Sequence, residues 1–200
     1  MSNFNQNHPK LGSQIKVDPI RSLSNITKIK SLLQDSPRDL ALFTLGINSA
    51  LRASDLLEIP VGKVESLGVG DSFEIREKKT GKLRHVTMNE SVLDALTKYL
   101  AVRRSTSKKE PLFLSRKGSS SGLTVQSLHR LVKGWCHEIG LRGNYGSHTL
   151  RKTFGYHQRV TFKTELPILM VAFNHSSQKQ TLSYLGIQDS EVEAAFMNSL

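Results

Sequence analysis

The chain has 200 residues, with 28 lysines and arginines against 17 aspartates and glutamates, so its formal net charge is +11. This length fits one domain, or a compact domain with an N-terminal arm, and the charge indicates a polyanionic partner, nucleic acid before any other. No apolar run reaches about 18 residues, which excludes a transmembrane helix, and the single Cys136 excludes an internal disulfide and fits a cytoplasmic location.

The basic residues are concentrated in the body of the chain. Residues 76–84 hold five basic groups against one acid, and residues 98–117 hold seven against one. After Lys179 the sequence contains three acids and neither lysine nor arginine. We therefore expect the body, and not the tail, to face the phosphates of a nucleic acid.

In chain order, residues 1–21 are polar and interrupted by prolines and a glycine, which predicts a flexible N-terminal arm. Apolar residues at helical spacing predict a helix from about Ile26 to Leu33. Ser36 followed by Pro37 is typical of a helix start, so the apolar run 40–47 is expected to be a buried helix. A short helix over residues 52–58 follows.

Residues 72–87 change character, because apolar and polar residues alternate on both sides of a lysine-rich turn containing Gly81. This pattern predicts a basic antiparallel β-hairpin. Helices are then expected over residues 89–100, 124–139, 148–160, 165–173, 177–184 and about 190–198, with a Ser/Gly/Lys loop at 116–122. The expected fold is α+β, mainly α, with one domain over residues 22–188 and a C-terminal tail or helix over 189–200.

Five residues whose side chains suit phosphoryl transfer stand in a fixed order: Arg52, His148, Arg151, His175 and Tyr184. Guanidinium groups offer permanently charged, bidentate donors to the non-bridging oxygens of a phosphodiester. A histidine can take or share a proton, and a phenol becomes a nucleophile once cations lower its pKa. A covalent step conserves the energy of the broken bond, so neither ATP nor a metal or other cofactor is expected.

With this order and spacing, the chain resembles the catalytic domain of the tyrosine recombinase (phage integrase) family over about residues 25–187. The resemblance rests on Leu51-Arg52-Ala53-Ser54-Asp55-Leu56, on the turn Lys78-Lys79-Thr80-Gly81-Lys82, on His148-Thr149-Leu150-Arg151, and on Asn174-His175 nine residues before Tyr184. The resemblance implies that residues 22–188 form a recombinase catalytic domain.

The resemblance implies a role for each residue of the set. Arg52 and Arg151 would hold the scissile phosphate, and His148 would accept or share the tyrosine proton. His175 would donate to a non-bridging oxygen, and Tyr184 would form a 3′-phosphotyrosyl bond.

Two further residues complete the implied site. Lys79 would protonate the leaving 5′ oxygen, because the family's lysine usually directly precedes Thr-Gly, and Lys78 and Lys82 remain alternatives. Asp55 would brace the site from behind, where the commoner residue is glutamate.

The chain departs from the family pattern at other positions. Asn174 stands where a glycine is usual, and asparagine tolerates left-handed backbone conformations. Lys152 replaces a histidine often seen after the second arginine. About two dozen residues precede the domain where most members carry a separate DNA-clamping domain, so the chain is expected to be either a short member, like the fimbrial invertases, or a fragment.

Double-stranded DNA is the expected partner. The residues expected to contact it are Lys78, Lys82, Arg116, Lys117, Gln126, Arg130, Lys133 and Lys152. The basic residues would contact phosphates, and Gln126, near the start of its helix, is a candidate for a base edge. The resemblance implies a homotetramer on two DNA sites, formed from monomers or weakly associated chains and linked by C-terminal tails.

The function that the sequence predicts is site-specific DNA recombination. Three alternatives differ in outcome: a type IB topoisomerase-like enzyme would relax supercoils, a catalytically idle regulator would only bind DNA, and a hydrolytic nuclease would need a carboxylate cluster for metal ions. No such cluster, and no paired cysteine or histidine pattern of a zinc site, stands out in the sequence.

Overall fold

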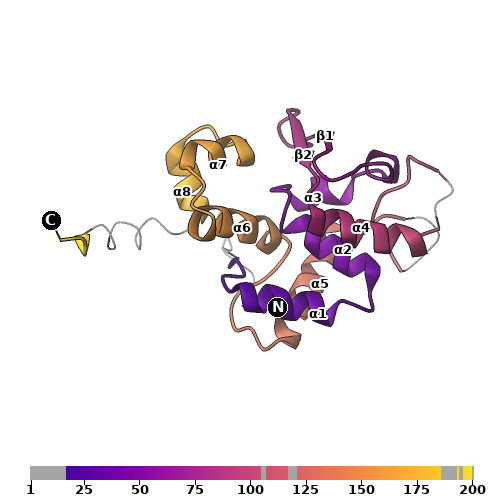
Figure 1. Ribbon diagram of the computed structural model, residues 1–200, viewed down its shortest axis with the longest axis horizontal. Coiled ribbons are helices and arrows are strands. Elements are labelled where there is room, and N and C mark those ends of the chain that lie inside the picture. Colours follow the sequence, from indigo (N-terminus) through magenta and orange to yellow (C-terminus); the bar gives the residue numbers. More distant parts are fainter. Residues whose placement is uncertain (1–16, 105–106, 117–120, 186–192, 194–195, 200) are drawn as a thin grey trace, which may run out of the picture.

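The computed structural model describes residues 17–104, 107–116, 121–185, 193 and 196–199. Within these ranges the elements follow one another as shown in Figure 1: α1 (Leu23–Leu32), α2 (Pro37–Gly46), α3 (Ala53–Leu57), a 3₁₀ turn (Val61–Lys63), β1 (Ser72–Arg76), β2 (Leu83–Thr87), α4 (Glu90–Val102), α5 (Val125–Glu138), α6 (Thr149–Tyr156), a π-helical turn (His157–Thr161), α7 (Leu166–Phe173) and α8 (Gln178–Leu185). The mainly helical fold with one small sheet confirms the predicted fold class.

The predicted helix starts have the expected chemistry at two of three sites. The side chain of Asn89 accepts a hydrogen bond from the backbone of Val92 at the start of α4, and Thr124 accepts one from Ser127 at the start of α5. Ser36 occupies the cap position before Pro37, but its hydroxyl makes no capping bond. The fixed φ of the proline therefore favours the start of α2 without that bond.

The predicted hairpin is an antiparallel pair in which Ser72 lies opposite Thr87 and Arg76 lies opposite Leu83. Phe73 and Val86 face each other and are buried in the core, whereas alternate residues point to solvent. Gly81 has a φ of 69° in the turn, a conformation that costs glycine little.

The buried apolar residues form two clusters. The larger one contains residues from each of the helices α1 through α5 and from the hairpin, such as Phe43, Leu96 and Val132. The smaller one contains Ala50, Leu169, Phe173 and Leu185 and joins α7 and α8 to α6. In Figure 1, α6, α7 and α8 accordingly form a block of their own, beside the hairpin and the remaining helices.

The described end of the predicted N-terminal arm packs onto this body. Ile20 is only 1% exposed, its backbone N–H donates to the hydroxyl of Thr153, and its carbonyl oxygen lies 2.9 Å from Nε2 of His157. Residues 17–20 therefore extend the core, because Ile20 supplies the apolar surface, and α6 and the π-helical turn after it supply polar partners. Residues 1–16 of the predicted arm lie outside the described residues.

The predicted helix at 148–160 is α6 followed by the π-helical turn, and the predicted helix at about 190–198 falls largely outside the described residues. Among the residues that the structure describes, no helix is long and apolar enough to cross a membrane.

Two glycine substitutions test the packing of α8 on α6. A Cβ atom at Gly155 would lie 2.5 Å from Leu185 Cδ2 and 2.6 Å from Phe173 Cζ, both in buried side chains. We expect Gly155→Ala to lower the free energy of unfolding by about 1–3 kcal/mol in urea denaturation, because the core has no room for the methyl group.

The matched control is Gly134→Ala in α5, where an added Cβ would meet no atom within 4 Å. This variant is expected to gain about 0.5–1 kcal/mol, because alanine favours the helix over glycine. Equal effects of the two substitutions would contradict the packing of α7 and α8 against Gly155.

Candidate active site

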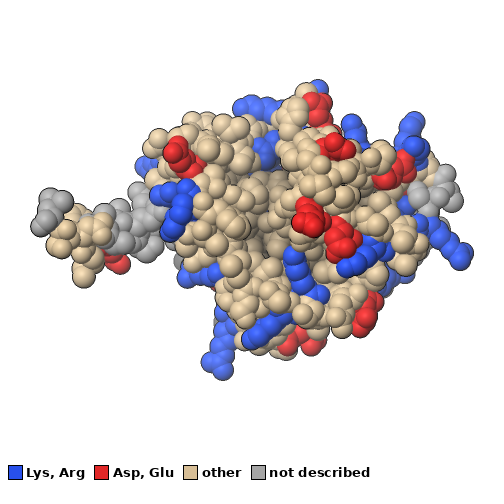
Figure 2. Space-filling model, in the orientation of Figure 1, with Lys and Arg blue, Asp and Glu red and all other residues tan. Residues whose placement is uncertain are grey.

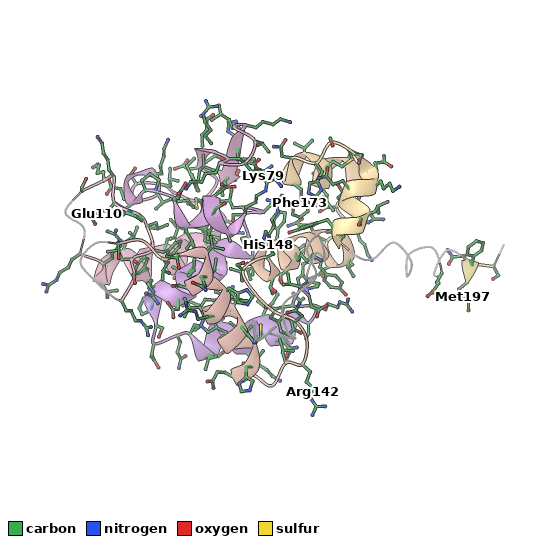
Figure 3. All side chains as sticks on the ribbon, turned by 180° about the vertical axis from the view of Figure 1, so that it is seen from behind. Lys79, Glu110, Arg142, His148, Phe173 and Met197 are labelled. Atoms are coloured by element: carbon green, nitrogen blue, oxygen red, sulfur yellow. The ribbon has the colours of Figure 1, made fainter. Side chains whose placement is uncertain are left out.

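All six residues predicted to be catalytic line one cavity of about 540 Å³. Its walls are formed by Val17, Arg52, Lys79, His148, Arg151, Lys152, His175, Gln180, Ser183 and Tyr184. These side chains come from the segment before α1, the start of α3, the hairpin turn, α6 and the residue before it, the α7–α8 loop and α8. Figure 3 shows Lys79, His148 and Phe173 converging from the hairpin, the start of α6 and the end of α7.

Arg151 is the most deeply buried cation of this cavity, at 3% exposure. Its guanidinium donates to the carbonyl oxygen of Ala50 and, at 2.8 Å, to that of Phe173. Ala50, and Asn174 directly after Phe173, have φ values of 54° and 53°, a region that residues other than glycine rarely adopt. The arginine therefore joins three chain segments. One of the two residues whose carbonyl groups it contacts has a left-handed backbone conformation, and the other is directly followed by such a residue.

A second cluster centres on Glu77, which is 1% exposed. Its carboxylate lies 2.7 Å from Nη1 of Arg52 and 3.5 Å from Nε of Arg84, and it accepts hydrogen bonds from Thr80 at 2.6 Å and Asn174 at 3.0 Å. Burial by itself raises the pKa of this carboxyl, but the bonds from Thr80, Arg52 and Asn174 outweigh it and bring the pKa to about 2.

Asp55 also braces the site from within the protein. The carboxylate is 1% exposed, lies 3.9 Å from Arg52 Nη1, and accepts a hydrogen bond from the backbone N–H of Lys78 at 3.2 Å. It therefore connects α3 to the hairpin turn as well as to Arg52.

The two histidines of the cavity have lowered pKa values. For His175, desolvation and the nearby Arg151, Arg52 and Arg84 bring the pKa to about 4. For His148, desolvation acts in the same direction, followed by the charges of Arg151, Arg52 and Lys152. Both shifts favour the neutral imidazole, because a second positive charge is unfavourable beside the arginines.

The Tyr184 ring is enclosed by aromatic and cationic groups. Its centroid lies 5.2 Å from that of Phe173 and 5.4 Å from that of His175, while Arg151 Cζ and Lys152 Nζ lie 5.8 and 5.4 Å from it. Desolvation raises the pKa of the phenol, although the positive charge of Arg151 acts in the opposite direction. The hydroxyl is buried and has no hydrogen-bond partner among the described residues.

The three lysines of the hairpin turn differ in their surroundings. Lys78 forms an ion pair with Glu58, and Lys82 Nζ donates to Asn174 Oδ1 at 3.2 Å. Of the three, Lys79 is the one that lines the cavity. This placement favours Lys79 over its neighbours as the lysine that faces a substrate.

The residues expected to contact DNA are spread more widely. Lys152 lines the cavity, and Gln126, Arg130 and Lys133 are exposed on α5, whose first residues share a depression with Ser54 and Lys78. Arg116 instead lines a separate depression and lies 3.5 Å from Asp39, and Lys117 is outside the described residues. In the view of Figure 2, basic and acidic side chains are interspersed over the visible surface.

The sequence alone did not single out Glu77 and Arg84 as site residues. Glu77 is the one acidic residue in the segment 76–84, which also holds five basic residues. This unusual position was the sequence signal that could have marked Glu77 as a site residue. Arg84 on β2 donates to the carbonyl oxygens of Val171, at 3.1 Å, and Ala172, both near the end of α7. No local sequence pattern reveals this long-range contact. Among the described residues, no group of three or more histidine, cysteine, aspartate or glutamate side chains is arranged to hold a metal ion.

Two solved structures of recombinases share this fold. A structure of XerH recombinase bound to its difH substrate in a post-cleavage complex has a TM-score of 0.74 and 21% identity, covering 92% of this chain and 53% of the other. The XerA recombinase structure has a TM-score of 0.73 and 18% identity, covering 92% and 67%. Both structures therefore share the fold of this chain.

The model of the phage integrase family matches residues 15–191, and this chain belongs to that family. It is 37% identical to the probable integrase/recombinase YoeC of Bacillus subtilis (strain 168) over 90% of its own length and 95% of that protein. It is 29% identical to the tyrosine recombinase XerC of Caldanaerobacter subterraneus over 79% of its length, but spans only 44% of that relative. The family and these relatives identify the chain as a tyrosine recombinase enzyme.

A charge-removing substitution tests the buried cluster. We expect Glu77→Gln to lower the free energy of unfolding by about 2–4 kcal/mol, because it leaves Arg52 and Arg84 without their shared countercharge. Glu74→Gln on β1, where the carboxylate is half exposed beside His85, is expected to change stability by less than about 0.5 kcal/mol. Urea denaturation of both variants makes the comparison, and equal losses would contradict the role of Glu77.

The lowered pKa of His175 predicts a dependence of stability on pH. The unfolded chain takes up this proton near the usual histidine pKa of 6.5 and the folded chain only near pH 4, so the unfolded state holds more protons between these values. The free energy of unfolding therefore falls as the pH is lowered from 6.5 towards 4. Because the ring is partly exposed, we expect His175 to contribute about 1 kcal/mol of this loss.

Urea denaturation at pH values above and within this range, for the unsubstituted protein and for His175→Gln, measures the contribution. The variant is expected to lose less stability on acidification than the unsubstituted chain. His137→Gln, which removes an exposed ring from α5, is the control and should keep the original slope. An unchanged slope in His175→Gln would show that this ring is not the group responsible.

Proposed function

We propose that this chain is a site-specific DNA recombinase that cleaves and rejoins one strand at a time through a 3′-phosphotyrosyl bond to Tyr184. The observation that best supports the proposal is the convergence of two arginines, two histidines, a lysine and this tyrosine on one cavity. The names of the relatives, probable integrase/recombinase and tyrosine recombinase, support the same reaction class.

A phosphodiester suits the charge of the site. Three guanidinium groups, those of Arg52, Arg84 and Arg151, are gathered around the two buried carboxylates of Asp55 and Glu77. These groups carry more positive than negative charge, and a phosphate bound in the cavity would supply the missing negative charge. Arg52 and Arg151 then hold its non-bridging oxygens and stabilise the charge that develops as the pentavalent state forms.

The attacking group is the phenol oxygen of Tyr184. It forms a bond to phosphorus while its proton passes to His148, which the lowered pKa keeps neutral and able to accept. His175 donates to a non-bridging oxygen. In the tautomer required for that role, the hydroxyl of Thr181, 3.0 Å away, donates to Nδ1 and leaves the N–H on Nε2.

The bond that breaks joins phosphorus to the 5′ oxygen of the DNA. Lys79 gives its proton to that oxygen, so the strand leaves as a 5′-hydroxyl. One phosphodiester replaces another, so the step needs neither ATP nor a metal or other cofactor. Attack by the 5′-hydroxyl of a partner strand reverses the step, returns the protons to Lys79 and the phenol, and completes the exchange.

The partner in this proposal is double-stranded DNA. The chain would assemble as four protomers on two DNA sites, with basic residues such as Lys78, Lys82 and Lys152 on phosphates around the cleavage point and Gln126 near the bases. The net charge of +11 supports binding that weakens steeply with salt.

Removal of one hydroxyl group tests the reaction. We expect the unsubstituted protein to form an adduct with nicked suicide duplexes that survives denaturation in SDS, and Tyr184→Phe to form none while still binding DNA. Tyr156→Phe, which removes a hydroxyl from the last residue of α6, is the control and should form adducts normally. Adducts from Tyr184→Phe would contradict the assignment of the nucleophile.

A library of such duplexes distinguishes the related functions. Adducts that share a sequence support a site-specific recombinase, and rejoining between two duplexes that carry this sequence completes the test. Adducts without a shared sequence, accompanied by relaxation of supercoiled DNA, would indicate an enzyme of the type IB topoisomerase kind. Salt-sensitive binding without any adduct would indicate a DNA-binding regulator.

A further inference from the structure

The lysine turn of the hairpin is tied to the end of α7 by one carboxamide. Nδ2 of Asn174 donates to Glu77 at 3.0 Å and lies 3.4 Å from the hydroxyl of Thr80, while its Oδ1 accepts from Lys82 at 3.2 Å. Both ends of the side chain are used, and all three partners flank Lys79.

The backbone at Asn174 does not explain why this residue is an asparagine. It caps α7 with φ 53° and ψ 44°, a left-handed conformation that glycine adopts without strain. A glycine would therefore satisfy the turn before His175 equally well. The contacts of the carboxamide with the hairpin are what distinguish asparagine from glycine at this position.

Both ends of this connection are anchored independently of the turn. Arg84 on β2 donates to the carbonyl oxygens of Val171 and Ala172, which holds the end of α7 against the strand. Glu77 is fixed in the interior by its ion pair with Arg52 at 2.7 Å. The hairpin turn is thus the segment whose position depends on the hydrogen bonds of Asn174.

Lys79 depends on the placement of that turn. Its side chain is exposed on the cavity wall, and no hydrogen bond or ion pair to another described residue orients it. The backbone of the turn therefore sets where its ammonium group can reach. Displacement of a catalytic group by about 1 Å is enough to slow a reaction by roughly 100-fold.

We propose that the carboxamide of Asn174 is a positioning group that places Lys79 to protonate the leaving 5′ oxygen. The inference rests on the proposed recombinase reaction and adds a residue to it. Loss of the carboxamide should impair departure of the 5′ oxygen and leave phosphate binding and nucleophilic attack intact.

A change of leaving group separates these steps. In a suicide duplex whose scissile phosphate carries sulfur in place of the bridging 5′ oxygen, the leaving thiolate needs no proton, because a thiol has a pKa of about 8.5. We expect Asn174→Gly to form the covalent adduct about 10- to 100-fold more slowly than the unsubstituted protein on the oxygen duplex. On the sulfur duplex the two rates should be equal.

Two variants set the limits of the experiment. Lys79→Ala, which removes the acid itself, should show the same selective recovery on the sulfur duplex. Arg151→Ala, which removes a phosphate contact, should remain slow on both duplexes. Urea denaturation checks that Asn174→Gly is folded before its rates are compared.

The outcomes are separable. Equal slowing of Asn174→Gly on both duplexes would overturn the proposal, since the carboxamide would then act on phosphate binding or folding. An unchanged rate on the oxygen duplex would overturn it as well, and so would recovery of Asn174→Gly without recovery of Lys79→Ala. Absence of any adduct from the unsubstituted protein on either duplex would instead contradict the proposed recombinase reaction.

Discussion

The arrangement of the site follows from one constraint: three guanidinium groups, those of Arg84 and Arg151 buried and that of Arg52 partly exposed, lie close together and must be held there without being fully neutralised. Arg151 is held by the carbonyl oxygens of Ala50 and Phe173, whereas Arg52 and Arg84 share the carboxylate of Glu77. Carbonyl groups satisfy the N–H donors but carry no net charge, so the surplus of positive charge persists. Such a surplus costs stability in the free protein and favours a bound anion.

The fold around the site is built to tolerate this cluster. Ala50 and Asn174, both in left-handed backbone conformation, lie at or next to the carbonyl groups that Arg151 contacts. The ring of Phe173 belongs to the small apolar cluster that joins α6, α7 and α8, where it packs against Phe154. Desolvation, followed by the same positive charges, lowers the pKa of His148 and His175, so both rings stay neutral and can exchange protons. The charges that cost stability thus also contribute to the protonation states that the proposed chemistry needs.

The sequence predicted the residues that line the cavity more completely than the contacts that place them. Helical periodicity, the caps Asn89 and Thr124, and the alternation around Gly81 are local signals, and the structure confirms the elements they predict. The bonds of Arg84 to the end of α7 and of Thr153 to Ile20 span 87 to 133 residues along the chain. No local pattern encodes such contacts, so neither the polar network around Glu77 nor the docking of residues 17–20 could be predicted.

The most direct test of the account identifies the atom that becomes bonded to DNA. The unsubstituted protein, trapped on a nicked suicide duplex, would be digested with protease and nuclease, and the nucleotide-bearing peptide sequenced by mass spectrometry. We expect a 3′-phosphonucleotide on the oxygen of Tyr184. A nucleotide on any other residue, or one attached through its 5′ phosphate, would contradict it.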